Sequence, residues 1–337
     1  MTYSIPPLYP YSGYKFEFKE SQHMYFFNSG RSAFYFAVNV LKAKNDNLIF
    51  LLPAYTCYSV VDVMNQSGVE YNFVDIDNSL QFDKNDLEQM LDLYSNKSVV
   101  LIPTALFGIR LKNYKKMYPS IKVIEDLSHS LIEYKYKESD FAFTSYGKGK
   151  MISAWGGGVL FGLDTEIDEY YTSLPYENFF LFSFIFTQIQ KIISKYFWFL
   201  LEKSKYNPEK NLLHVSEEIA IKRLDKIKSA WIKGSLDKFD SNTTKETVFK
   251  YQNNISKEYQ FELGEIMPYI RFPVKKKIFK SGISHIYSYT KTYAVARKKR
   301  KLELSGAKLL AHDVSFLPTH SLISKEYIKE IIYHVNS

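Results

Sequence analysis

Short apolar runs alternate with longer amphipathic segments over the first half of the chain. Four short, largely apolar runs predict buried strands at residues 47–53, 69–75, 98–103 and 122–125. The segments before and between them carry apolar residues at helical spacing and predict helices at residues 33–41, 60–66, 84–94 and 112–118. This alternation predicts an α/β fold with a mixed, mostly parallel sheet, in which ligands bind at the carboxyl ends of the strands.

Changes in this pattern divide the chain into three regions, which are residues 1–165, 166–235 and 236–337. The first is a large α/β domain in which residues 1–27 form an irregular arm, and runs at 141–145 and 158–162 predict two further strands that can pair antiparallel. The second is an atypical aromatic, helical region. The third mixes short strands with a terminal helix near residues 325–334 and predicts a smaller C-terminal α+β domain.

The aromatic stretch 179–201 in the second region has the length of a membrane span. It consists of two apolar blocks, but polar side chains fall near its middle, namely Gln188, Gln190, Lys191 and Lys195. Because such groups are expensive inside a bilayer, we do not expect a transmembrane helix. Two alternatives stay open: a helical pair packed on the core or on a dimer partner, and shallow contact with a membrane surface.

The net charge narrows the class of ligands only a little. The 337-residue chain has 44 Lys and Arg against 36 Asp and Glu, a formal charge of +8. This surplus favours anionic ligands such as nucleotides or phosphosugars without selecting one. No nucleic-acid-binding motif accompanies the charge, so we expect no nucleic acid partner. The basic run 297–301 is expected to be a solvated helix face.

Cysteine usage bears on the cellular compartment. The single cysteine, Cys57, excludes an intrachain disulfide framework and a cysteine-rich zinc site. Residues 1–7 lack a basic segment followed by an apolar run, so we expect no signal peptide. These features predict a reduced, cytoplasmic compartment, with peripheral membrane contact if residues 179–201 provide it.

Two titratable residues follow the strand predicted at 122–125. Asp126 stands at its carboxyl end, and His129 lies three residues further on. An acid in this position can keep a pyridine nitrogen protonated, as enzymes that use pyridoxal phosphate (PLP) require. The alternatives are an aspartate that caps the next helix and a histidine with a purely structural role.

A lysine-containing glycine-rich segment follows at residues 145–158. It holds Ser145 and two candidate lysines, Lys148 and Lys150, either of which could form a Schiff base with a cofactor aldehyde. Surface charges in a flexible loop are the alternative. Upstream, residues 28–33 open a helix whose free backbone N–H groups could bind a phosphate, although an ordinary capped helix would look similar.

Taken in order, these motifs resemble the DegT/DnrJ/EryC1/StrS family of PLP-dependent sugar aminotransferases, which have the fold-type-I architecture of aspartate aminotransferase. The resemblance covers residues 28–162 and returns at residues 314–320. Its motifs stand at residues 29–33, 53–56, 73–77, 102–108, 124–130 and 145–158. The resemblance implies PLP as cofactor and a homodimer whose sites lie at the subunit interface.

The resemblance also implies roles for individual residues. The phosphate-binding turn falls on Gly30, Arg31 and Ser32, and a phosphate-binding serine falls on Ser145. Asp126 takes the place of the acid on the pyridine nitrogen, and His129 that of a residue touching the cofactor ring. The Schiff-base lysine stands five residues after the serine, which selects Lys150 over Lys148. Relatives with histidine at this position are dehydratases, so the lysine implies transamination.

Two positions and one segment depart from the family pattern. Cys57 stands where an aromatic residue stacks on the cofactor, and Tyr55 or Tyr58 could substitute for it. Trp155 replaces the glutamate before the paired glycines. The segment that reaches the partner subunit's phosphate has no match between residues 165 and 235.

The function implied is an aminotransferase that acts on a nucleotide-linked keto-sugar, with glutamate as amino donor, in the synthesis of surface polysaccharide. A second hypothesis is a non-catalytic or regulatory member of the same fold. It would bind a partner or a membrane surface through residues 179–201 and the basic run 297–301.

Overall fold

A computed structural model describes the fold of the chain. The described residues are 23–130, 139–147, 150–152, 156–162, 166–178, 218–226, 228–230, 232, 241–265, 267–278, 287–319 and 323–337. The aromatic stretch 179–201, Lys148 and Trp155 lie outside them. None of the helices in the described part combines the length and apolar character needed to cross a bilayer.

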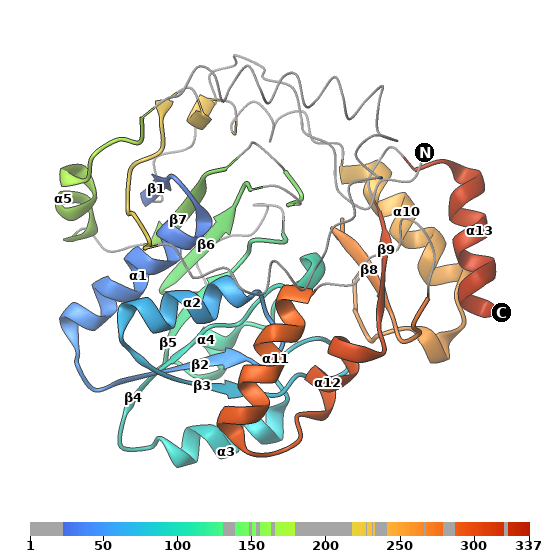
Figure 1. The fold of residues 1–337 in the computed structure, drawn as a ribbon, viewed down its shortest axis with the longest axis horizontal. Coiled ribbons are helices and arrows are strands. Elements are labelled where there is room, and N and C mark those ends of the chain that lie inside the picture. Colours follow the sequence, from blue (N-terminus) through green and yellow to red (C-terminus); the bar gives the residue numbers. More distant parts are fainter. Residues whose placement is uncertain are drawn as a thin grey trace.

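A mixed sheet forms the centre of the larger part of the molecule (Figure 1). In the described residues it has seven strands in the order β1-β7-β6-β5-β4-β2-β3. Their bounds are β1 His23–Phe27, β2 Leu48–Pro53, β3 Glu70–Val74, β4 Ser98–Leu101, β5 Lys122–Asp126, β6 Phe141–Ser145 and β7 Gly158–Gly162. Strands β3, β2, β4, β5 and β6 are mutually parallel, and β7 runs antiparallel to both β6 and β1. The predicted mostly parallel sheet is therefore confirmed.

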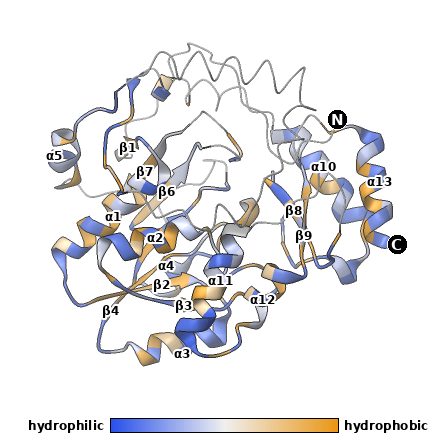
Figure 2. Ribbon diagram, viewed as in Figure 1, coloured by the Kyte–Doolittle hydropathy of each residue, from blue (hydrophilic) through white to orange (hydrophobic). Residues whose placement is uncertain are grey.

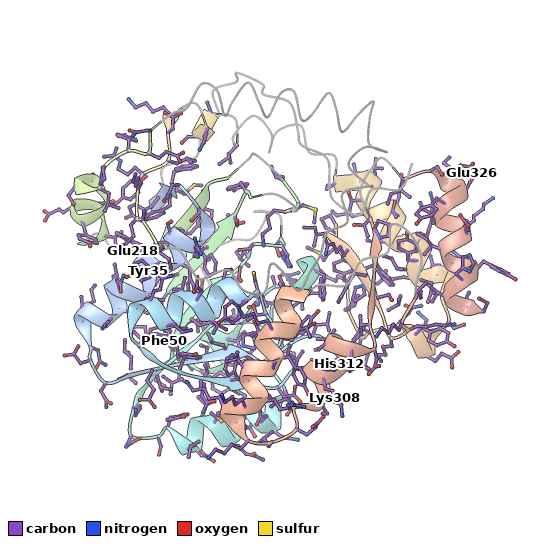
Figure 3. The ribbon with its side chains drawn as sticks, in the orientation of Figure 1. Tyr35, Phe50, Glu218, Lys308, His312 and Glu326 are labelled. Carbon is purple, nitrogen blue, oxygen red and sulfur yellow. The ribbon has the colours of Figure 1, made fainter. Side chains whose placement is uncertain are left out.

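Local sequence explains most of these elements. All six residues of β2 are buried, as its unbroken apolar run requires, and Phe50 lies at its centre (Figures 2 and 3). The helices that alternate with the strands are α1 (Gly30–Lys44), α2 (Tyr58–Ser67), α3 (Lys84–Leu93) and α4 (Tyr114–Met117). Helix α2 ends at Gly68, which adopts the left-handed conformation that glycine tolerates best. The four predicted helices are thus present at close to the predicted bounds.

The N-terminal arm contains a strand that the sequence pattern did not predict. Residues His23–Phe27 form β1 instead of irregular chain, and they pair with β7 in the register Phe27↔Gly158. Because β1 is parallel to β6 through their shared neighbour β7, the chain leaves β1 at the same edge where β5 and β6 end. The start of α1 is thereby brought to this edge.

The C-terminal third contributes to both parts of the molecule. Strands β8 (Arg271–Val274) and β9 (Ser315–Pro318) form a small antiparallel sheet, and α10 (Ser241–Asn254) lies against α13 (Lys325–Asn336). In contrast, α11 (Tyr287–Arg300) contacts α2 and β3 of the large sheet, and α12 (Ser305–His312) packs on α11 (Figure 1). Helix α5 (Glu166–Ser173) lies near β1 at the other end of the sheet.

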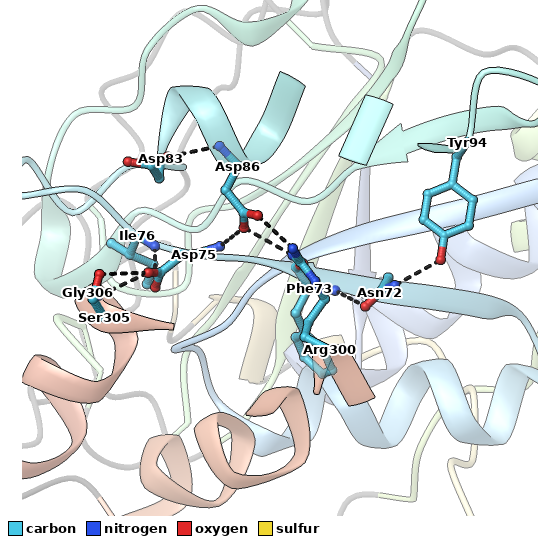
Figure 4. A network of polar contacts seen from close by, with 10 residues as sticks. All are labelled: Asn72, Phe73, Asp75, Ile76, Asp83, Asp86, Tyr94, Arg300, Ser305 and Gly306. Atoms are coloured by element: carbon cyan, nitrogen blue, oxygen red, sulfur yellow. Dashed lines mark hydrogen bonds and ion pairs between the residues drawn. The ribbon is translucent and has the colours of Figure 1, made fainter. Parts of the chain in front are cut away.

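A buried polar network fastens α11 and α12 to the large sheet (Figure 4). Asp75 accepts hydrogen bonds from the backbone N–H groups of Gly306 (3.1 Å) and Ala307 (2.9 Å), so it caps α12 from the end of β3. A side chain at Gly306 would place its Cβ 1.7 Å from the carbonyl oxygen of Ile76. Only glycine therefore permits this approach of the two backbones.

The basic run 297–301 is a solvated helix face only in part. Arg300 is buried in an ion pair with Asp86, and Lys299 lies 3.6 Å from the centre of the Tyr71 ring. Arg297, Lys298, Lys299 and Lys301 are exposed. The run is therefore a solvated face except for Arg300, whose buried ion pair the local charge pattern did not predict.

Candidate active site

The carboxyl ends of the parallel strands bring the predicted site residues to one edge of the sheet. Tyr55 follows β2, Asp126 ends β5, and Ser145 ends β6. Gly30 opens α1 directly beside them, because a Cβ on Gly30 would lie 2.6 Å from the Cβ of Ser145. In parallel α/β sheets this edge is where ligands bind.

Asp126 is held by the backbone of the segment that follows β4. Its N–H donates to the carbonyl of Pro103, and its carbonyl accepts from the N–H of Ala105, both at 2.9 Å. Its side chain accepts a hydrogen bond from the N–H of Ser128 at 2.9 Å and is almost completely buried. Pairing with the segment after β4 therefore fixes the direction of this carboxyl group.

Burial governs the charge state of Asp126. It raises the pKa of the carboxyl group above its usual range, and the positive charge of Lys150 and the hydrogen bonds from Ser128 oppose this effect. A buried carboxylate needs a cationic partner to stay ionised. The site is therefore suited to a ligand that brings a protonated nitrogen to Asp126.

His129 is bonded through both ring nitrogens. Its Nδ1 accepts a hydrogen bond from the N–H of Phe107 at 3.2 Å, and its Nε2 lies 2.9 Å from the hydroxyl oxygen of Tyr289. Burial lowers the pKa of the imidazole well below its usual range, and the charges of Lys150 and Arg271 lower it further. The ring is therefore neutral at physiological pH.

Lys150 lies on the loop between β6 and β7, where its N–H donates to the carbonyl of Gly147 at 3.3 Å. Its positive charge affects the pKa of both Asp126 and His129. The amine therefore belongs to the same cluster as the acid. The choice of Lys150 over Lys148 rests on the sequence spacing, since Lys148 lies outside the described residues.

The start of α1 presents backbone rather than side chains to the site. Ser29 caps the helix by accepting from the N–H of Ser32 at 3.0 Å. A Cβ on Gly158 would lie 2.4 Å from the nitrogen of Gly30, so three segments meet here without room for larger residues. A helix N-terminus pressed against a serine hydroxyl is a favourable place for a phosphate.

Two of the side chains predicted to hold the phosphate make hydrogen bonds to the protein. The guanidinium group of Arg31 is bonded to Asp62 on α2 at 3.1 Å and is 35% exposed. The hydroxyl of Ser32 donates to the carbonyl of Ala220 at 3.2 Å. Gly30 and Ser145 remain as the pair that the structure brings together.

Of the aromatic candidates near Cys57, Tyr55 reaches the site. It is fully buried and meets the ring of Tyr289 edge to face, with the ring centres 5.1 Å apart. Tyr58 instead lies under the amine of Lys291, which is 3.7 Å from its ring centre. Cys57 precedes α2, where its sulfur accepts a hydrogen bond from Ser59 at 3.1 Å.

Two residues at the site were not predicted from the sequence. Tyr289 opens α11 and touches His129, although the two are 160 residues apart. Arg271 begins β8, and its charge acts on His129 and on the hydroxyls of Tyr55 and Tyr289. Neither residue stands in a local motif that could have revealed it.

The donors at this edge fit PLP. Asp126 suits its ring nitrogen, the Lys150 amine suits its aldehyde, and the Gly30 backbone with the Ser145 hydroxyl suits its phosphate. The close approach of Gly30, Ser145 and Gly158 forms a cradle that a Cβ on either glycine would fill. The acid, the amine and the anion-binding turn thus come from separate segments and meet at one edge.

Comparisons with known proteins bear on the family and on the fold. Residues 15–180 match the model of the DegT/DnrJ/EryC1/StrS aminotransferase family. No curated protein sequence gives a significant match.

Solved structures give the fold. The PseC aminotransferase of pseudoaminic acid biosynthesis from Helicobacter pylori has a TM-score of 0.67 at 17% identity, over 93% of this chain and 85% of that one. The sugar aminotransferase Spr1654 from Streptococcus pneumoniae, described as putative and in its PMP form, has a TM-score of 0.67 at 16% identity and the same coverage. GDP-4-keto-6-deoxymannose-3-dehydratase (ColD), a mutant with bound GDP-perosamine, has a TM-score of 0.66 at 15% identity, over 93% and 88%. The chain therefore has the fold-type-I architecture of PLP-dependent enzymes.

Proposed function

This chain belongs to the DegT/DnrJ/EryC1/StrS aminotransferase family, and on that premise we propose that it is a PLP-dependent aminotransferase that acts on a nucleotide-linked keto-sugar. The observation that carries the proposal is the charge cluster of Asp126, His129 and Lys150. The charge of the Lys150 amine acts on one buried acid, Asp126, and on one buried neutral imidazole, His129, at the ligand-binding edge of the sheet.

Each residue has a defined task in this reaction. When bound, PLP supplies an aldehyde that condenses with amines and a ring that withdraws electrons from the adjacent carbon. Asp126 holds the ring nitrogen in its protonated form, since the buried carboxylate and the cation neutralise each other. The Lys150 amine would take the proton from the α-carbon of the amino donor and would later deliver a proton to the former keto carbon of the sugar as the amino group is added there. Gly30 and Ser145 hold the phosphate and so orient the ring.

The lysine separates this chain from the dehydratases of the family. Relatives with histidine in place of the lysine are dehydratases, whereas Lys150 provides an amine that can both bind the cofactor and move a proton. We therefore propose transamination, with glutamate as the amino donor.

The substrate class is supported by similarity and charge. ColD, of similar fold, binds GDP-perosamine, a nucleotide-linked sugar. The formal charge of +8 favours a substrate that carries a diphosphate. We further propose a cytoplasmic homodimer with a role in the synthesis of surface polysaccharide, where amino sugars are needed in nucleotide-activated form.

The proposal is tested with the purified chain and added PLP. We expect a visible absorption band at about 420 nm, as for a lysine-bound cofactor, which Lys150→Ala abolishes and Lys148→Ala leaves in place. Glutamate should then bleach the band, and a panel of nucleotide keto-sugars should restore it when the right acceptor is supplied. A chain that stays colourless with excess PLP, or that loses the band with Lys148→Ala instead, would refute the assignment.

A further inference from the structure

The buried pair of His129 and Tyr289 is not accounted for by the roles given above. The Nε2 of His129 and the hydroxyl oxygen of Tyr289 are 2.9 Å apart, and the two rings are nearly parallel, with 2° between their planes. Both side chains are buried, and Tyr289 comes from the C-terminal third of the chain. The site at the edge of the large sheet is thus completed by a residue of α11.

The hydrogen bonds of His129 determine which nitrogen carries its proton. The Phe107 N–H can only donate, so Nδ1 must accept and carries no proton. The ring is neutral because burial and the charges of Lys150 and Arg271 lower its pKa. A neutral imidazole with a bare Nδ1 has its proton on Nε2. His129 therefore donates to Tyr289, and the tyrosine oxygen accepts.

The phenol proton of Tyr289 is then available to another acceptor. Burial raises the pKa of Tyr289 well above its usual range, and Cys57, Asp126 and Tyr55 raise it further, so the hydroxyl stays protonated. Those three neighbours border the ligand-binding edge of the sheet. The O–H of Tyr289 is therefore a donor within the Asp126 cluster.

Three contacts hold this arrangement in place. The Tyr289 ring packs edge to face on Tyr55, and Phe107 has φ +59°, a left-handed conformation rare outside glycine. Phe107 donates to His129 through its N–H and accepts from the N–H of Ile270 through its carbonyl, at 2.8 Å. Backbone conformations of this kind concentrate at functional sites, where the surrounding structure enforces them.

We propose that Tyr289 is a positioning residue that accepts the Nε2–H of His129, and so fixes the orientation of that ring, and leaves its own hydroxyl proton for an acceptor on the bound ligand. The oxygen attached to carbon 3 of the PLP ring is an acceptor of this kind. This second half of the proposal rests on the proposed function, whereas the first half concerns the protein without cofactor. The packing of α11 on the large sheet would thus place a hydrogen-bond donor, the hydroxyl of Tyr289, at the cofactor ring.

The test compares two tyrosines on one helix. Tyr289→Phe keeps the ring and its contact with Tyr55 but removes the hydroxyl. Tyr293→Phe is the matched control, because Tyr293 lies one turn further along α11, is buried, and its hydroxyl has no hydrogen-bond partner in the part of the chain that the structure describes. Circular dichroism and thermal unfolding establish that both variants fold.

The first measurement uses cofactor-free protein labelled with ¹⁵N-histidine. The wild type and Tyr293→Phe should show a slowly exchanging Nε2–H signal for His129, identified by its loss in His129→Gln. In Tyr289→Phe we expect this signal to broaden or vanish, because the buried N–H has lost its acceptor. An unchanged signal in Tyr289→Phe, or an Nδ1–H signal in the wild type, would overturn the positioning role.

The second measurement is the dissociation constant of PLP. Tyr289→Phe should raise it about tenfold, roughly 1.4 kcal/mol, while Tyr293→Phe leaves it unchanged. Equal affinities for the two variants would overturn the donor role. If neither the wild type nor the variants bind PLP but the histidine signal behaves as expected, the positioning role stands and the proposed function fails.

Discussion

Arg300 and Asp86 form a bidentate ion pair that joins the end of α11 to α3 (Figure 4). The two nitrogens of the guanidinium group lie 2.6 and 3.0 Å from the two carboxylate oxygens, and both side chains are largely buried. Planar, paired contacts of this type are among the strongest hydrogen bonds in proteins. Because Tyr289 stands at the other end of α11, this pair also fixes the helix that carries a residue of the site.

Arg300→Gln should destabilise the protein by about 3–5 kcal/mol, because it leaves the Asp86 carboxylate buried without its counter-charge. Urea unfolding measures the effect. Arg297→Gln is the matched control: it lies one turn earlier on α11 with an exposed side chain, and a change within about 0.5 kcal/mol is expected there. Equal effects of the two substitutions would show that the buried ion pair does not hold α11.

Gly30→Ala should weaken the binding of PLP at least about tenfold, because its Cβ would lie 2.6 Å from the Cβ of Ser145 and would push the phosphate turn apart. Titration of the visible band gives the affinity. Gly147→Ala is the control, since its Cβ would make only an ordinary contact of 3.6 Å with the Ser145 hydroxyl. Unaltered affinity in Gly30→Ala would exclude this turn as the phosphate site.

Asp126→Asn should stabilise the cofactor-free protein at neutral pH. The pKa of Asp126 is higher in the folded state than its ordinary value of 3.8. At a pH between these two pKa values, the folded state therefore binds more protons than the unfolded state. Stability therefore falls as pH rises through this window, and the loss is complete above the folded pKa. Thermal unfolding from pH 3 to 8 should show the advantage of the asparagine growing with pH.

The same substitution should impair PLP binding, because asparagine cannot offset the charge of a protonated ring nitrogen. Stability and ligand binding therefore change in opposite directions in this variant. An asparagine variant that is less stable than the wild type at pH 7 without cofactor would contradict the raised pKa of Asp126.

The sequence by itself determined most of the helices and strands, and those residues of the site that stand in local motifs. The unbroken apolar run of β2 and the glycine that ends α2 are dictated by nearest neighbours in the chain, and the structure follows them closely. The positions of Asp126 and Ser145 at strand ends follow from the same pattern, because parallel strands share one carboxyl edge. A repeating local pattern suffices for such features.

The tertiary structure decided which distant segments complete that edge. Strand β1 pairs with β7, and the short aromatic run of residues 25–27 does not by itself say which strand it joins. Arg31 turns to Asp62, and Tyr289 reaches His129 across 160 residues, through packing that no local spacing encodes. The physical reason is the same in each case: the energy of these contacts comes from partners that the chain brings together only when it folds.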